Sequence, residues 1–169
     1  MELKRVVVTG LGAVTPVGLD SEETWNNLVA GKSGAGPITQ FDASKFKTHF
    51  ACEVKGLDVN KYIDRKEARK IDRYTQLALV SAIQAVEDSG MDLESVDKER
   101  IGVVFGVGIG GIRTFQDEVT YYGQHIDDGP RFGPFFIPKM ISDIAAGQIS
   151  IKFGFHGPNY ATTSACASS

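Results

Sequence analysis

Three short segments with the character of buried strands alternate along the chain with longer helical stretches. They are "KRVVVTGLG" at residues 4–12, "RIGVVFGVG" at residues 100–108 and "NYATTSA" at residues 159–165. The first two are short apolar runs that end in glycine, which is typical of strands buried within a sheet. Because strands that alternate with helices usually form a mostly parallel sheet covered on both faces, the sequence predicts an α/β fold.

Helical segments lie between these runs. The predicted helices cover residues 20–34, 64–90, 111–122 and 139–154. Asp20 and Glu23 have the spacing of a capping box, as do Asp64 and Glu67, and Gly90 stands where a helix C-cap belongs. The second half of the long second helix is apolar or small nearly all round, which predicts that it is buried.

Composition limits the classes of function. The chain has 169 residues, 42% hydrophobic and 23% charged, with a net charge of −3, which is typical of a soluble globular domain or part of one. No apolar run approaches the roughly 20 residues of a membrane helix, and nothing in the net charge favours nucleic acid. Two cysteines are too few for a disulfide framework. We therefore expect a cytoplasmic protein with free thiols.

The stretch "GVGIGG" contains a G-x-G-x-x-G pattern at Gly106, Gly108 and Gly111. This pattern between a strand and a helix can bind a dinucleotide, provided that an acidic residue ends a second strand about 20 residues later. The acids near that position, Asp127 and Asp128, lie in a Gly- and Pro-rich loop. The favoured interpretation is that the glycines allow tight turning and close approach of backbone.

Basic residues crowd the beginning of the long helix. They are Arg65, Lys66, Arg69, Lys70 and Arg73. Cations at a helix N-terminus oppose the helix dipole, so this run either forms a functional surface for an acidic partner or a phosphate, or is a solvated face partly neutralised by neighbouring acids. The residues alone leave both readings open.

Cys166 follows the third predicted strand within the small-residue run "TTSACASS". A strand-to-helix turn would place its sulfur at a helix N-terminus, where amides and dipole stabilise negative charge, and its small neighbours would leave room for a substrate carbonyl. A lone cysteine can equally be an inert buried residue. His49, His125 and His156 have no metal-ligand spacing to another histidine or cysteine.

Five motifs occur in the order found in one enzyme family. They are "VVVTGLGAVTPVG", "RKEARKIDRYTQLA", "GVGIGG", "GPFFIPKMISDIAAGQISIKFGFHGPN" and "TTSACASS". In this order they resemble the β-ketoacyl-acyl-carrier-protein synthases, and most of all the synthase II branch of bacterial fatty-acid synthesis. The resemblance extends over the whole chain.

The resemblance implies a thiolase-like α/β fold with layers αβαβα, of which residues 1–169 would be the N-terminal half, ending just after the nucleophile. It implies that Cys166 carries the acyl chain as a thioester and that malonyl-carrier protein loses CO2 to give the attacking carbanion. Ile109 would gate the acyl pocket, and Lys66, Arg69 and Lys70 would dock the acidic acyl carrier protein. No metal or organic cofactor is expected, and the whole enzyme would be a homodimer.

The family's catalytic histidines, a supporting lysine and a gating phenylalanine belong to the second half, and none of this chain's histidines falls in the matching motifs. Residues 1–169 alone are therefore expected to be inactive, and also unstable or prone to associate. Two alternatives remain. One is another thiolase-fold ketosynthase, of the synthase I or polyketide type. The other is a catalytically empty fragment that binds the carrier protein.

Overall fold

The computed structural model describes residues 3–129 and 131–168, which form two compact units. Unit 1 comprises Met1–Asp58 and Val80–Gly90, and unit 2 comprises Val59–Leu79 and Met91–Ser169. The helix α3, Arg73–Asp88, runs through both units. The described residues contain no helix that is long and apolar enough to cross a membrane.

Unit 1 contains the helix α1, Ser21–Val29, and a small antiparallel sheet of β1, Ala35–Pro37, and β2, Phe50–Cys52. The predicted capping of α1 is confirmed in part. The Asp20 side chain accepts a hydrogen bond from the Glu23 amide at 2.7 Å, while the Glu23 side chain reaches back to the Leu19 amide, one residue before the expected partner.

Residues 4–12 do not form the predicted strand. Val6 and Val8 are 90% and 80% exposed, and within the described residues no strand pairs with this segment. Instead the backbone lies directly on the second half of α3, where the Leu11 amide donates to the Asp88 carboxylate at 2.7 Å. The amides of a strand need hydrogen-bond acceptors on a neighbouring strand. Here a side chain on the surface of α3 is the acceptor instead.

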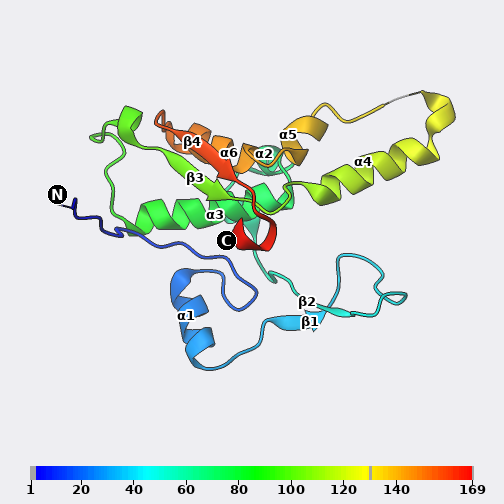
Figure 1. Cartoon of the computed structure of the whole chain (residues 1–169), viewed down its shortest axis with the longest axis horizontal. Coiled ribbons are helices and arrows are strands. Elements are labelled where there is room, and N and C mark those ends of the chain that lie inside the picture. Colours follow the sequence, from blue (N-terminus) through cyan, green and yellow to red (C-terminus); the bar gives the residue numbers. More distant parts are fainter. Residues whose placement is uncertain (1–2, 130, 169) are drawn as a thin grey trace. The chain divides into compact units, whose positions relative to one another are not determined.

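Unit 2 carries a parallel pair of strands and most of the helices (Figure 1). Its elements are α2, Arg65–Ala68; the first half of α3; β3, Val103–Gly106; α4, Ile112–Gln124; α5, Phe136–Met140; α6, Ile144–Phe153; and β4, Asn159–Thr162. The two strands pair in register from Val103↔Asn159 to Gly106↔Thr162, and α6 packs against both. This parallel pair with its covering helix agrees with the predicted α/β class.

One face of the β3–β4 pair is buried and the other is open. Val103 of β3 is 8% exposed and α6 packs against β3, whereas Val104 and Tyr160 are 68% and 60% exposed. Alternate residues of a strand point to opposite faces, so α6 covers only one side. Among the described residues, the other face of this pair therefore carries exposed apolar side chains.

Two predicted helices are each broken into two. The segment 64–90 forms α2 and α3, separated by a turn in which the Asp72 side chain accepts a hydrogen bond from the Tyr74 amide at 3.1 Å and so begins a new helix. The segment 139–154 is interrupted at Ile141, whose ψ of 143° is extended. The predicted C-caps are confirmed by the left-handed Gly90 and Gly154, with φ of +63° and +71°.

Candidate active site

Cys166 lies in a short turn directly after β4. Residues Ala165–Ser168, here called the cysteine turn, form one turn of 3-10 helix, and the thiol is free and exposed. The Ser164 amide donates to the Ser168 hydroxyl at 2.7 Å, and the Ala167 amide donates to the Ser164 carbonyl at 3.1 Å. Ala165 has a left-handed φ of 51°, which is uncommon for a residue other than glycine. These two hydrogen bonds tie the cysteine turn to Ser164, the residue before it.

The glycine-rich segment after β3 lies against the cysteine turn. A methyl group at Gly106 would stand 1.8 Å from the Ser168 carbonyl oxygen, and one at Gly108 would stand 3.9 Å from the Ala165 carbonyl oxygen. The Val107 amide donates to the Thr162 carbonyl at 2.9 Å and so extends the ladder between the strands. Only glycine permits so close an approach at Gly106, which is the favoured interpretation of these glycines.

Ile109 extends from the loop that follows. We call residues 108–111 the Ile109 loop. The Ile109 side chain is 67% exposed, and its carbonyl accepts a hydrogen bond from the Ser142 hydroxyl at 3.0 Å. The Gly111 amide donates to the Met140 carbonyl at 3.0 Å. The structure therefore places the Ile109 loop beside the cysteine turn on one side and the end of α5 on the other.

Two residues at the start of α3 support the same region. The Tyr74 hydroxyl donates to the Ile141 carbonyl, and the Thr114 hydroxyl of α4 donates to the Asp72 carboxylate. Burial raises the pKa of Tyr74 above its ordinary value of 10.0, and the negative charges of Asp72 and Asp143 raise it further. Tyr74 therefore stays a neutral hydrogen-bond donor at every physiological pH.

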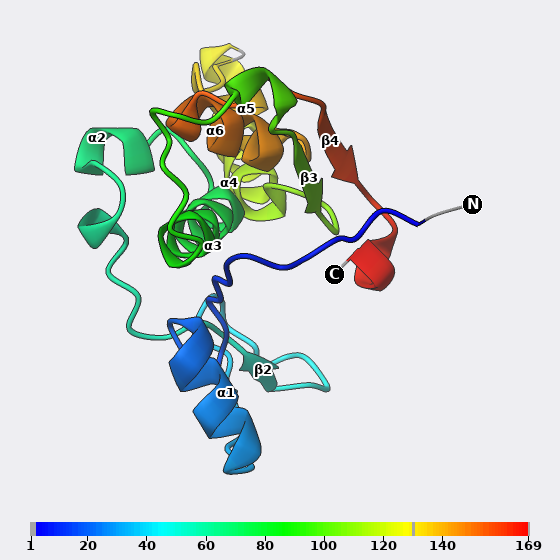
Figure 2. The ribbon, with the colours of Figure 1, turned by 90° about the vertical axis from the view of Figure 1, so that its left-hand side faces the viewer.

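The three predicted docking residues lie together on another part of unit 2. Lys66 is in α2, and Arg69 and Lys70 are in the turn that follows it, all exposed. Lys70 forms a 4.0 Å ion pair with Glu67, and no ion pair of Lys66 or Arg69 occurs within the part of the chain described. The prediction that these cations begin one long helix is wrong, because α2 and α3 are separate. Figure 2 shows α2 and the C-terminal turn on opposite sides of unit 2.

Two of the three histidines make local interactions within unit 2. His125 stacks on Tyr121 with ring centroids 4.2 Å apart, and His156 lies 2.8 Å from the Glu99 carboxylate. His49 is an exposed loop residue of unit 1. Across residues 3–129 and 131–168 no group of three or more His, Cys, Asp or Glu side chains could hold a metal ion.

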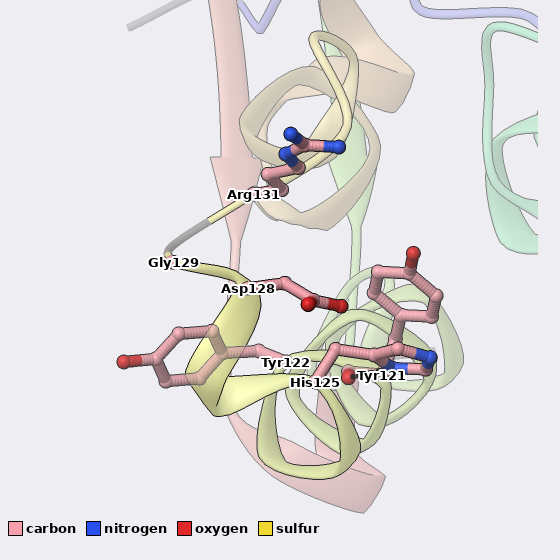
Figure 3. A pocket seen from close by; sticks show the side chains of 6 residues that line it. All are labelled: Tyr121, Tyr122, His125, Asp128, Gly129 and Arg131. Carbon is pink, nitrogen blue, oxygen red and sulfur yellow. Dashed lines mark hydrogen bonds between the residues drawn. The ribbon is translucent and has the colours of Figure 1, made fainter.

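A small cavity adjoins His125 at the end of α4 (Figure 3). Its lining residues are Tyr121, Tyr122, His125, Asp128, Gly129 and Arg131. Its volume of about 20 Å3 is close to that of a single water site. This cavity is too small for an acyl chain or a nucleotide.

Sequence reasoning missed the residues that support the Ile109 loop. Ser142 is 33 positions from Ile109, and Asp72 is 42 positions from Thr114. Neither pair lies within one element, so no periodicity or capping pattern connects them. Ser142 lies within one of the five family motifs, "GPFFIPKMISDIAAGQISIKFGFHGPN". Nothing in that motif distinguishes Ser142 from the residues beside it.

The fold is that of the thiolase-like ketosynthases. The Burkholderia phymatum β-ketoacyl synthase superposes with a TM-score of 0.80 and 25% identity over 98% of this chain and 41% of that chain. The ishigamide ketosynthase/chain length factor superposes with a TM-score of 0.84 at 24% identity, over 93% of this chain and 39% of that chain. A third structure, AntDE:AntF, is a polyketide ketosynthase in complex with its acyl-carrier protein, with a TM-score of 0.71 and 27% identity over 96% of this chain and 41% of that chain.

Residues 3–169 match the family described as "Beta-ketoacyl synthase, N-terminal domain", and the chain belongs to that family. Its sequence is 46% identical to 3-oxoacyl-[acyl-carrier-protein] synthase 2 of Staphylococcus aureus strain COL over 97% of this chain, and 44% identical to the Synechocystis protein of the same name over 99%. The chain spans 39% and 40% of the length of these two curated relatives.

Proposed function

We propose that the chain is the N-terminal half of an elongating β-ketoacyl-acyl-carrier-protein synthase of the synthase II type. The observation that carries the proposal is the cysteine turn, which presents an exposed thiol at the end of β4 beside the Ile109 loop. The 46% identity to a curated synthase 2, against 27% to a type II polyketide ketosynthase, favours the fatty-acid enzyme over the polyketide type.

In the proposed reaction the Cys166 sulfur attacks the thioester carbonyl of an acyl-carrier protein. A new C–S bond forms to Cys166, and the carrier's thiol leaves with the proton. Malonyl-carrier protein then loses CO2, and the resulting carbanion attacks the acyl carbonyl on Cys166. A C–C bond forms between the carbanion and the acyl carbonyl carbon, and the C–S bond to Cys166 breaks. The product, 3-oxoacyl-carrier protein, leaves, and the Cys166 thiol is free again. The Cys166 backbone amide is one candidate donor to the developing oxyanion.

Ile109 is the proposed gate of the acyl pocket. The role is supported by the exposure of its side chain and by its position one residue after Gly108, which adjoins the cysteine turn. Lys66, Arg69 and Lys70 form the proposed docking surface for the acidic carrier protein, supported by their exposure and their shared positive charge. The proposal includes a homodimeric, cytoplasmic whole enzyme.

The test is acylation of Cys166 in the full-length protein. After incubation with acyl-carrier protein, peptide mass mapping should find the acyl group on Cys166 and not on Cys52, which lies in β2 of unit 1. Cys166→Ala should abolish the adduct, and Cys52→Ala should retain it. An adduct on Cys52, or none on a folded enzyme, would refute the proposal. A fragment that binds the carrier without any acylation would support the binding-module alternative instead.

A further inference from the structure

We infer that Ser142 is a specificity-determining positioning residue, whose hydroxyl holds the Ile109 loop and sharpens the selection of acyl-chain length. The inference rests on the proposed role of Ile109 as the gate of the acyl pocket. It adds a residue that no part of the family pattern assigns.

The Ile109 loop has unusual conformational freedom. Gly108 and Gly110 flank Ile109, and Gly110 has a φ of +91°, a conformation that other residues rarely adopt. A side chain of 67% exposure between two glycines has little packing to fix its direction. Its orientation must therefore come from hydrogen bonds to the backbone around it.

Ser142 supplies such a bond at Ile109 itself. The Ser142 hydroxyl donates to the Ile109 carbonyl at 3.0 Å in a solvent-exposed hydrogen bond. That carbonyl belongs to the peptide unit linking Ile109 to Gly110, so the bond restrains the ψ angle of Ile109 and with it the direction of the side chain. A methyl group at Gly110 would come within 2.6 Å of the Met140 carbonyl oxygen, so the loop lies directly on the segment that carries Ser142.

The support beneath Ser142 is itself anchored. Ile141, the preceding residue, has its carbonyl bound by the hydroxyl of Tyr74, which lies in α3 next to the fully buried Thr75. The Thr114 hydroxyl, three residues beyond Gly111, is bound by Asp72 of the same region. Ser142 therefore links a glycine-flanked loop to a fixed support, and loss of its hydroxyl frees the loop while the support remains.

The test measures how well the enzyme discriminates between acyl chains of different length, and not its total activity. In the full-length enzyme, kcat/KM is measured for the longest acyl chain accepted and for the first chain rejected, and the ratio of the two is compared between variants. Ser142→Ala should lower this ratio by about threefold to tenfold, the range expected for one hydrogen bond. Ser142→Thr retains a hydroxyl and should keep the ratio within about twofold. Ser95→Ala is the matched control, since it removes a 3.2 Å serine–carbonyl bond to Asp92 outside the site.

A second readout does not depend on activity. Hydrogen exchange of the peptide containing Gly111 should become faster in Ser142→Ala and stay unchanged in Ser142→Thr and Ser95→Ala. Faster exchange with an unchanged selectivity ratio would reduce Ser142 to a structural role and overturn the inference, as would unchanged exchange. Ile109→Phe separates the two proposals. If it leaves the chain-length profile unaltered, the gate itself is refuted, and if it shifts the profile while Ser142→Ala does not, only the role of Ser142 is refuted.

Discussion

Replacing Gly106 with alanine tests the contact between β3 and the cysteine turn. The added methyl group would lie 1.8 Å from the Ser168 carbonyl oxygen, and ordinary van der Waals contact begins at 3.4 Å. The turn must therefore retreat by about 1.6 Å, the difference between these two distances. The nearest atom is backbone, so no side-chain rotation can relieve the clash.

Two costs follow from this displacement. Overpacking of this kind destabilises a folded domain by about 1–3 kcal/mol. A displacement of about 1 Å at a reacting group lowers rates by about a hundredfold. We therefore expect Gly106→Ala to reduce the rate of Cys166 acylation about a hundredfold in the full-length enzyme. The adduct is followed over time by mass spectrometry and corrected for the folded fraction from circular dichroism.

Gly123→Ala is the matched control. It makes the same chemical change within α4, where a methyl group meets no atom within 4 Å, and alanine favours a helix over glycine by about 1 kcal/mol. This variant should acylate normally and be slightly more stable. The reasoning fails if Gly106→Ala acylates within about threefold of the unaltered enzyme, because the turn would then have moved without consequence or would not lie where the structure places it.

Three further predictions concern other parts of the chain. Changing Lys66, Arg69 and Lys70 together to glutamate should weaken carrier-protein binding and reduce the salt dependence of that binding, measured by titration at low and high salt. An unchanged affinity at low salt would show that these three residues are only a solvated surface without a role in docking. The raised pKa of Tyr74 means that its contribution to stability is fully present below pH 10.0 and is lost as the pH rises through the folded-state pKa; Tyr74→Phe should remove this alkaline loss in thermal melts, and identical pH profiles would contradict it. Residues 1–169 expressed alone should associate or melt without cooperativity, because the open face of β3–β4 is apolar; a monomer with a sharp transition by size exclusion and melting would contradict this.

Local signals were predicted well from the sequence. The cap at Asp20 and the terminating glycines at Gly90 and Gly154 depend on residues within one helical turn of each other. The cysteine turn likewise follows from a strand and a run of small residues adjacent in the chain. In each case the side chain that determines the structure lies within a few positions of the backbone that it affects.

Features that depend on distant partners were not predicted. The valines of residues 4–12 favour a strand, but a strand forms only where a second strand lies beside it. The hydrophobic pattern of one segment does not show whether such a second strand is present. The break before α3 was not predicted, because the Asp72 carboxylate accepts hydrogen bonds both from the Tyr74 amide and from the Thr114 hydroxyl, which is 42 positions away. The support of Ile109 by Ser142 joins two loops, so no periodic pattern records it.

The parallel register of β3 and β4 restricts how this sequence can change in length. Gly106 lies opposite Thr162. The number of residues from Gly106 to Ile109 and the number from Thr162 to Cys166 therefore together determine where Ile109 lies relative to Cys166. Deletion of one residue in either interval would shift Ile109 relative to the Cys166 thiol by roughly 3 Å. An insertion between α4 and α5 leaves both intervals intact. Natural length variation in this region should therefore gather in the α4–α5 connection and be absent from the two short intervals that follow the strands.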